Sequence, residues 1–137
     1  MADTFQLEVA TPERLLVDEQ VSRAELPGEK GYLGILPGHA PLLSALGAGV
    51  LTYAGSSGDR VLAIFGGFVE VLGDHVRVLA EHAEYARDIN ADAARRELEE
   101  ANAKLKNLRD TAESEVTLRE IQNAQARVDA AQRASSA

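Results

Sequence analysis

Glycine and proline are confined to the first part of this chain. All eleven glycines and all four prolines precede residue 74, and none occurs in residues 88–137. Both residue types form turns and end helices, so their density favours short strands in the first part, and their absence permits long helices in the second. The chain therefore divides near Arg87 into residues 1–87 and residues 88–137. Its 137 residues leave room for one ordinary domain with an appended element.

Residues 1–87 show the alternation that is typical of β-strands. Phe5, Leu7 and Val9 alternate with polar residues. Gly73 and Asp74 separate the apolar segments FVEVL and HVRVL, and glycine supplies the positive φ of a two-residue hairpin turn. Several short strands with closely spaced turns predict an antiparallel β-sandwich or a flattened barrel.

Residues 88–137 show a helical period instead. Apolar residues follow alternating steps of three and four from Ala91 to Ala112, and a second set runs from Thr117 to Ala131. The polar segment RDTAESE (109–115) between them predicts the bend of an antiparallel helical hairpin. In an antiparallel hairpin, the numbers of two residues that face each other add up to the same value in every layer. The predicted hairpin interface consists of Ala94, Leu98, Ala101, Leu105, Ile121, Ala124 and Val128.

The predicted helical interface is rich in alanine. A buried methylene group contributes about 0.8 kcal/mol, so an alanine layer stabilises the hairpin much less than a leucine layer would. This pattern leaves two alternatives open, namely helices that separate easily and a tight interface that is permanently closed.

The composition argues against several functional classes. The formal net charge is -8 and the pI is near 4.8, so we expect no nucleic-acid partner, because phosphate neutralisation requires clustered Lys and Arg. The chain has no cysteine and hence no disulfide or thiolate metal ligand, which suits a reducing compartment. The N-terminal MADTFQLEV lacks the apolar run of a secretory signal, and no segment has the roughly 20 apolar residues of a membrane span.

The titratable residues form no recognisable catalytic or metal site. His39, His75 and His82 are scattered and lack the i, i+4 pairing of a helical zinc site. Gly31 and Gly34 are not followed by the Lys-Ser/Thr pair of a phosphate-binding loop. We therefore expect no catalytic residue, no metal and no cofactor.

The window GYLGILPGHAPLL (31–43) contains no Asp, Glu, Lys or Arg although the chain is strongly acidic. A compact uncharged surface commonly marks a protein contact. We expect Tyr32 and His39 to be exposed in such a docking surface, and Leu42 and Leu43 to point inward. The alternatives are a buried corner and a site in which His39 acts as a general base.

Long stretches of the chain resemble one family. GYLGILPGHAPLLSALGAGVL (31–51) is similar to the signature of the epsilon subunit of F-type ATP synthases, which reads close to G-x-L-G-I-L-P-G-H-A-P-L-L-T-x-L-x-x-G. The likeness continues through VLAIFGGFVEVLGDHVRVLAEHAEYARDI (61–89) and the N-terminal LEVATPERLLVDEQVSRAELPGEKG (7–31). The segment NADAARRELEEANAKL (90–105) also resembles the equivalent mitochondrial subunit, which is called delta.

The resemblance implies an α+β fold, with an N-terminal antiparallel β-sandwich of about ten strands and a C-terminal antiparallel helical hairpin. It implies a non-catalytic subunit of the central stalk, or rotor, which couples proton translocation to ATP synthesis. The expected partners are the gamma subunit, the ring of c subunits and, when the hairpin is extended, the alpha/beta catalytic head. Association with the inner (plasma) membrane, on its cytoplasmic side in a bacterium, occurs only through the complex. The docking residues that the resemblance implies are Tyr32, Leu33, Gly38, His39 and Ala40.

Two departures from the family pattern concern docking and regulation. Many bacterial members carry an acidic residue where this chain has Tyr32. The nucleotide-binding motif of some members, close to Ile/Leu-Asp-x-x-Arg-Ala, aligns here with Asn90 at the acid and Ala93 at the arginine. Asp92 and Arg95 restore the spacing after a shift in register and are the candidate nucleotide-binding pair. Because the aligned motif has lost its acid and its cation, we expect weak ATP binding or none.

The charges of the second helix bear on inhibition of ATP hydrolysis. Its arginines are nearly balanced by acidic residues, so we expect only a mild electrostatic attraction to the catalytic head. A rival from another class is a free-standing ligand-binding β-sandwich with a dimerising helical arm. Co-purification with a gamma-like chain distinguishes the rotor subunit from this rival.

Overall fold

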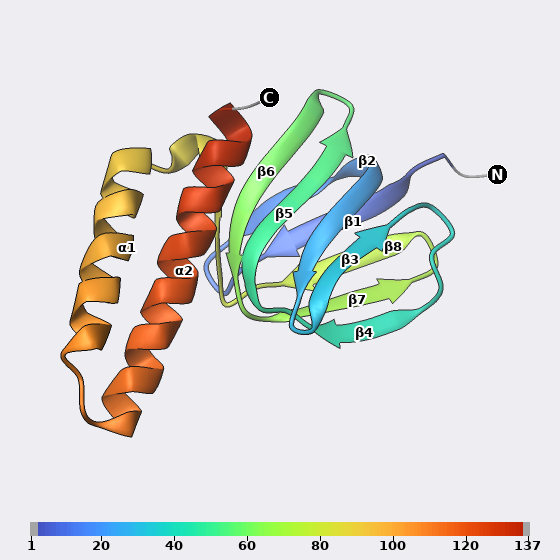
Figure 1. Cartoon of the computed structure of the whole chain (residues 1–137). Coiled ribbons are helices and arrows are strands. Elements are labelled where there is room, and N and C mark those ends of the chain that lie inside the picture. Colours follow the sequence, from blue (N-terminus) through green and yellow to red (C-terminus); the bar gives the residue numbers. More distant parts are fainter. Residues whose placement is uncertain (1–2, 136–137) are drawn as a thin grey trace.

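The computed structural model describes residues 3–135 and contains nine strands followed by two long helices (Figure 1). The strands are β1 (Phe5–Ala10), β2 (Leu15–Gly28), β3 (Gly31–Ile35), β4 (Leu42–Ala45), β5 (Ala48–Gly55), β6 (Gly58–Phe65), β7 (Phe68–Leu72), β8 (His75–Leu79) and β9 (His82–Tyr85). A short 3-10 helix (Ala86–Asp88) leads into α1 (Ala91–Lys106), and α2 (Thr111–Ser135) follows. The predicted α+β class is therefore confirmed, with nine described strands against the ten or so expected.

The strands form a sandwich because the long strand β2 takes part in both layers. The hydrogen-bonded order is β4-β7-β8-β1-β2-β5-β6-β9, and β3 also pairs with β2. Residues 15–21 of β2 pair with β1, whereas residues 24–28 pair with β3. The β1–β8 pair is parallel, and every other pair among the described strands is antiparallel. This single parallel pair is a departure from the fully antiparallel sandwich that the sequence predicts.

Strands β5 and β6 show how alternation divides the apolar residues between two cores. Leu51 and Leu62 point into the sandwich and are fully buried. Their neighbours Val50, Ala63 and Phe65 point to the other side of the same strands and belong to a second apolar cluster that includes residues of both helices. Fully burying one Leu side chain stabilises a fold by about 1.5–3 kcal/mol, so the inner cluster is the main source of sandwich stability.

The predicted hairpin turn between β7 and β8 is confirmed. Gly73 has φ 63°, a left-handed conformation that costs glycine little and other residues more. The turn pairs Leu72 with His75 directly across the two strands. This register decides which side chains of β7 and β8 share a face of the sheet.

The helices begin at side-chain caps. Asn90 Oδ1 accepts a hydrogen bond of 3.0 Å from the Ala93 N–H at the start of α1. Asp110 Oδ1 accepts one of 2.7 Å from the Ala112 N–H at the start of α2. The bend predicted at residues 109–115 is therefore wrong in its position. Because Asp110 caps a helix that begins at Thr111, the connection consists of residues 107–110.

Helix α2 lies between the β5–β6 side of the sandwich and α1 (Figure 1). Two ion pairs link the helices, from Lys104 to Glu120 at 3.6 Å and from Arg127 to Glu97 at 2.8 Å. In each ion pair the two residue numbers add up to one less than the value that facing residues of the predicted hairpin share. The antiparallel register is therefore within one residue of the sequence-based expectation. Neither described helix is long and apolar enough to cross a membrane.

Candidate functional site

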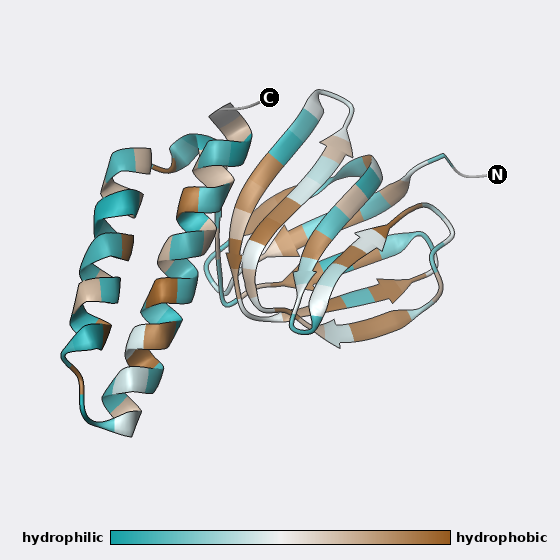
Figure 2. Ribbon diagram, viewed as in Figure 1, coloured by the Kyte–Doolittle hydropathy of each residue, from teal (hydrophilic) through white to brown (hydrophobic). Residues whose placement is uncertain are grey.

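The helices cover one side of the sandwich, and the opposite side is open. Helix α2 packs on β5 and β6, whereas neither described helix packs across the outward side of the layer formed by β4, β7, β8 and β1 (Figure 1). Helix α2 approaches this side at one end, where Phe68 borders a cavity with Arg119 and Asn123 of α2. We call this side the open face. Hydrophobic residues recur along β4 and β7 in this layer (Figure 2).

Four large apolar side chains are exposed on the open face. Leu43 of β4 is 73% exposed, and Phe68 and Leu72 of β7 and Leu79 of β8 are 55–65% exposed. Phe68 lies directly across from Leu79, and Leu43 lies directly across from Glu70 of β7. Leu43 is also the diagonal neighbour of Phe68 and Leu72, and diagonal neighbours are about 7–8 Å apart, so the four side chains lie near one another around Glu70. We call Leu43, Phe68, Leu72 and Leu79 the apolar patch.

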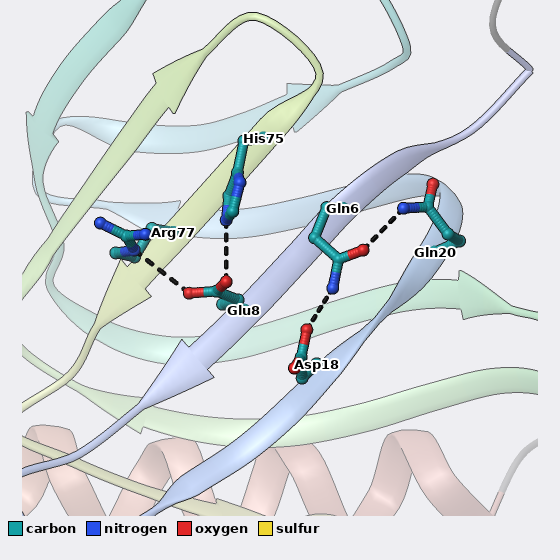
Figure 3. A network of polar contacts seen from close by, with 6 residues as sticks. All are labelled: Gln6, Glu8, Asp18, Gln20, His75 and Arg77. Atoms are coloured by element: carbon teal, nitrogen blue, oxygen red, sulfur yellow. Dashed lines mark hydrogen bonds and ion pairs between the residues drawn. The ribbon is translucent and has the colours of Figure 1, made fainter.

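A polar network occupies the rest of the open face (Figure 3). Glu8 of β1 accepts hydrogen bonds from Arg77 Nε at 3.1 Å and from His75 Nε2 at 2.9 Å. The Arg77 hydrogen bond is the main cause that lowers the pKa of Glu8, partial desolvation opposes it, and His75 adds to the lowering. The network consists of Gln6, Glu8, Asp18, Gln20, His75 and Arg77.

The polar network and the apolar patch on the open face differ in how well they tolerate contact with water. The polar network satisfies its hydrogen bonds internally and is compatible with water. The apolar patch places four large side chains in water on one sheet face, and contiguous patches of this kind usually mark protein contacts. The apolar patch is therefore the strongest candidate for a docking surface on the described residues.

Tyr32 is exposed, but it lies on the helix side rather than on the open face. Its hydroxyl oxygen accepts a hydrogen bond of 3.0 Å from the Val50 N–H, and Val50 belongs to the cluster that packs against α2. Tyr32 also lines a cavity of about 380 Å³ together with Asp129 and Arg133 of α2. The predicted docking window is thus divided, with Tyr32 turned toward the hairpin.

Residues 36–41 of the window form the connection between β3 and β4. Gly38 has φ 82° in an exposed turn, and Ala40 is exposed as well. His39 is half-buried, and its Nδ1 donates to the Ala40 carbonyl oxygen at 2.7 Å. Leu33 is partly buried against the sandwich core. These residues leave a small uncharged turn at the surface.

The expectation for Leu43 is wrong, and that for Leu42 is confirmed. Leu42 packs against the core, whereas Leu43 is 73% exposed. Successive side chains of a strand point to opposite faces, so only one of two adjacent leucines on β4 can enter the core. The sequence-based interpretation treated this segment as a corner rather than a strand, and it therefore predicted that both leucines point inward.

Each of the three histidines has a defined contact within the fold. His75 bonds to Glu8, and the His82 ring stacks on Phe65 with centroids 5.2 Å apart. His39 bonds to the backbone oxygen of Ala40, with no carboxylate or hydroxyl partner in the described part of the chain. Within residues 3–135 no group of three or more acidic or histidine side chains is arranged to hold a metal ion.

The two candidate nucleotide-binding residues, Asp92 and Arg95, form an ion pair with each other. Arg95 Nη1 lies 3.2 Å from Asp92 Oδ1, one turn apart on the surface of α1. Their side chains are 53% and 80% exposed. Asn90, which stands at the acidic position of the motif, uses its side chain to cap α1. The pair is therefore an exposed surface ion pair at the helix start.

One arginine of the hairpin forms ion pairs with both the sandwich and α1. Arg127 of α2 donates from Nε to Glu84 of β9 and from Nη1 to Glu97 of α1. Partial burial works to lower the pKa of Arg127, but the two carboxylates outweigh it and raise the pKa. The three residues line a cavity of about 720 Å³ between hairpin and sandwich, beside the predicted interface residues Ala101 and Ala124.

The predicted interface residues of the hairpin differ in burial. Ala94, Ala101, Ala124 and Val128 are buried. Leu98, Leu105 and Ile121 are partly exposed. Because α2 also packs on β5 and β6, the hairpin is folded onto its own sandwich and is not a free arm of the kind that the rival interpretation needs.

Sequence reasoning missed the apolar patch. The segments FVEVL and HVRVL carry apolar residues at both parities, so that Phe68, Leu72 and Leu79 remain outside when the valines enter the core. A strand whose outward positions are also apolar is the signal that identifies such a surface. That signal was present in the sequence beside the turn at Gly73.

Comparison with known proteins gives consistent matches. Residues 4–86 match the family of the ATP synthase delta/epsilon chain β-sandwich domain. The chain is 57% identical over 99 residues to the ATP synthase epsilon chain of Solibacter usitatus, covering 72% of this chain and 74% of the relative. It is 38% identical over 133 residues to that of Syntrophobacter fumaroxidans, covering 97% and 99%.

Two solved structures share the fold. A chain in the OSCP/F1/c-ring structure of Euglena gracilis mitochondrial ATP synthase has a TM-score of 0.83 at 21% identity, covering 100% of this chain and 84% of that chain. A chain in the central stalk/c-ring structure of the Tetrahymena thermophila enzyme has a TM-score of 0.68 at 18% identity, covering 92% and 95%. With more than half of its residues matching the family and a relative of 57% identity, this chain belongs to the ATP synthase delta/epsilon chain family.

Proposed function

We propose that this chain is a non-catalytic rotor subunit in the central stalk of an F-type ATP synthase, where it couples proton translocation to ATP synthesis. The observation that carries the proposal is the open face, because a sandwich with one side covered by its own helices leaves four exposed apolar side chains on the other. Membership of the delta/epsilon chain family supports an ATP synthase as the complex in which we propose that this face binds a partner.

The gamma subunit is the proposed partner of the apolar patch. Phe68 and the three leucines are each half to three-quarters exposed, so covering them removes a substantial apolar area from water. Fully burying one such side chain contributes about 1.5–3 kcal/mol, so the four together offset a large part of the cost of association.

The c-subunit ring is the proposed partner of the β3–β4 turn. Gly38, His39 and Ala40 form an uncharged surface turn that directly precedes β4 and the apolar patch. Leu33 supports this turn from the core, and Tyr32 contributes at the helix side. The chain then reaches the membrane only through the complex, on the cytoplasmic side if the source is bacterial.

The hairpin is proposed to regulate ATP hydrolysis. The described state is closed, with α2 against the sandwich. Two helices of about twenty residues laid end to end would reach roughly 60 Å at 1.5 Å per residue, which is long enough to contact the alpha/beta head. Since the seam is alanine-rich, we propose a shallow equilibrium between closed and extended states and mild inhibition.

Nucleotide binding to the isolated chain is proposed to be weak. Asp92 and Arg95 pair with each other on the surface of α1, so a phosphate would have to displace Asp92 to bond to Arg95. Calorimetry with ATP should give no dissociation constant tighter than the high-micromolar range, roughly -5 kcal/mol. A low-micromolar constant would refute this part of the proposal.

Size-exclusion chromatography with a gamma subunit tests the central proposal. The full chain should co-elute with gamma, and Phe68→Arg should abolish co-elution because it places a charge in the apolar patch. Val116→Arg is the matched control, since Val116 has the same 58% exposure but lies on α2. Failure of the unmodified chain to bind gamma would favour the free-standing ligand-binding sandwich. Equal losses in the two variants would refute the assignment of the docking face.

A further inference from the structure

A single carboxylate lies in the middle of the apolar patch. Glu70 is on the outward side of β7, between Phe68 and Leu72 of the same strand. Directly across the sheet its neighbours are Leu43 on β4 and Arg77 on β8. Glu70 is exposed and makes no ion pair or side-chain hydrogen bond within residues 3–135.

The nearest cation is already committed elsewhere. Arg77 donates from Nε to Glu8 at 3.1 Å, and Glu8 also accepts from His75 at 2.9 Å. Glu8 therefore has two basic hydrogen-bond partners, whereas Glu70 has no such partner among the described residues, although Arg77 lies directly across from it. Moving Arg77 to Glu70 would deprive Glu8 of its guanidinium hydrogen bond. The arrangement keeps Arg77 in the polar network.

Covering the apolar patch changes the environment of Glu70. A carboxylate surrounded by leucine and phenylalanine side chains loses its hydration when a partner covers them, and an unpaired buried charge costs several kcal/mol. A partner that was purely apolar would incur this cost. A partner with one basic side chain in the middle of an apolar ring would instead gain a desolvated, charge-assisted hydrogen bond.

We propose that the partner of the open face presents a lysine or arginine that pairs with Glu70, encircled by apolar side chains that cover Leu43, Phe68, Leu72 and Leu79. This inference rests on the proposed function for the identity of the partner, and it specifies the chemistry of that partner's contact. The chain's net charge of -8 steers a basic surface toward it. Glu70 then determines orientation and specificity, while the apolar ring supplies affinity.

Replacing Glu70 with leucine distinguishes a cationic partner from an apolar one. Glu70→Leu enlarges the apolar patch, so an apolar partner should bind it more tightly, whereas a partner with a basic side chain should bind it more weakly. We expect Glu70→Leu and Glu70→Gln each to weaken gamma binding at least about tenfold, because one member of a covered charge pair is lost. The loss should be smaller at high salt.

The controls separate this inference from the proposed function. Glu99→Leu makes the same exchange at an exposed position of α1 and should leave the affinity unchanged. Thermal unfolding should show both leucine variants to be as stable as the parent chain. If the parent chain does not bind gamma, both the proposed function and this inference are overturned. If Phe68→Arg weakens binding and Glu70→Leu strengthens it or leaves it unchanged, the docking face stands and this inference alone is overturned.

Discussion

Replacing Arg127 with methionine should loosen the hairpin without disturbing the sandwich. Arg127 is the residue through which α2 holds both Glu84 of β9 and Glu97 of α1. Its side chain and that of Glu84 are 23% and 24% exposed, whereas that of Glu97 is 52% exposed. Methionine retains much of the apolar stem and removes the charge, so packing changes little.

The magnitude follows from the two carboxylates separately. The pair with Glu97 is half in water and contributes at most about 1 kcal/mol, as exposed ion pairs do. The pair with Glu84 is mostly out of water, and losing a hydrogen bond to a charged group of this kind costs about 1.5–3 kcal/mol. We therefore expect Arg127→Met to lower the free energy of unfolding by about 2–3 kcal/mol. A cycle with Glu84→Gln should assign most of that loss to the Glu84 pair.

Urea unfolding followed by circular dichroism measures the loss, and amide hydrogen exchange localises it. Amides of α1 and α2 should lose protection, while those of β1 and β8 should keep theirs. Arg95→Met is the matched control, since Arg95 pairs only with Asp92 on an exposed helix surface and its loss should cost less than about 0.5 kcal/mol. Equal effects of the two substitutions, or equal loss of protection in sheet and helices, would refute the reasoning.

Three further predictions concern acid stability, a glycine and the helical register. The lowered pKa of Glu8 stabilises the fold above its usual pKa of 4.5, and this contribution is lost as the pH falls through the lowered value. Glu8→Gln should accordingly make the melting temperature less dependent on pH in this acid range. Gly67→Ala should lower the free energy of unfolding, measured with urea, by at least about 3 kcal/mol. Gly67 has φ 110°, and an added Cβ would lie 2.1 Å from a backbone oxygen. Gly34→Ala, with open space around it and no positive φ, should stay within about 0.5 kcal/mol. Ala101→Cys with Ala124→Cys should form a disulfide rapidly, which needs Cα atoms within about 7 Å, and locking should raise ATP hydrolysis slightly and reversibly. Failure to crosslink would contradict the register.

The fold class was accessible from the sequence because it depends on local periodicity. The period-two alternation of Phe5, Leu7 and Val9 and the glycine turn at Gly73 each specify their own geometry without reference to the rest of the chain. The three- and four-residue steps after Arg87 do the same for the helices. The bend was misplaced because a capping contact by Asp110 outweighs the polar composition of residues 109–115.

The candidate site was less accessible because it depends on contacts between distant segments. The uncharged window at residues 31–43 was the predicted docking surface. Tyr32 of that window lies on the side of the hairpin instead, where its hydroxyl oxygen accepts a hydrogen bond from the Val50 N–H. The polar network joins Glu8 to Arg77, residues that are far apart in the chain and become neighbours through the parallel pairing of β1 with β8. Nothing in local composition specifies that pairing.

The sequence by itself determined that this chain has apolar residues on both sides of several strands, since each strand's alternation can be counted. It could not determine which of those sides is covered. Val50 and Phe68 are both apolar residues on the outer sides of their layers, but α2 folds back over Val50 and leaves Phe68 in water. That difference arises from where a helix of the same chain packs, which is a property of the tertiary structure and not of the strands themselves. The same packing makes one side of the sandwich part of the core and leaves the other available to a partner.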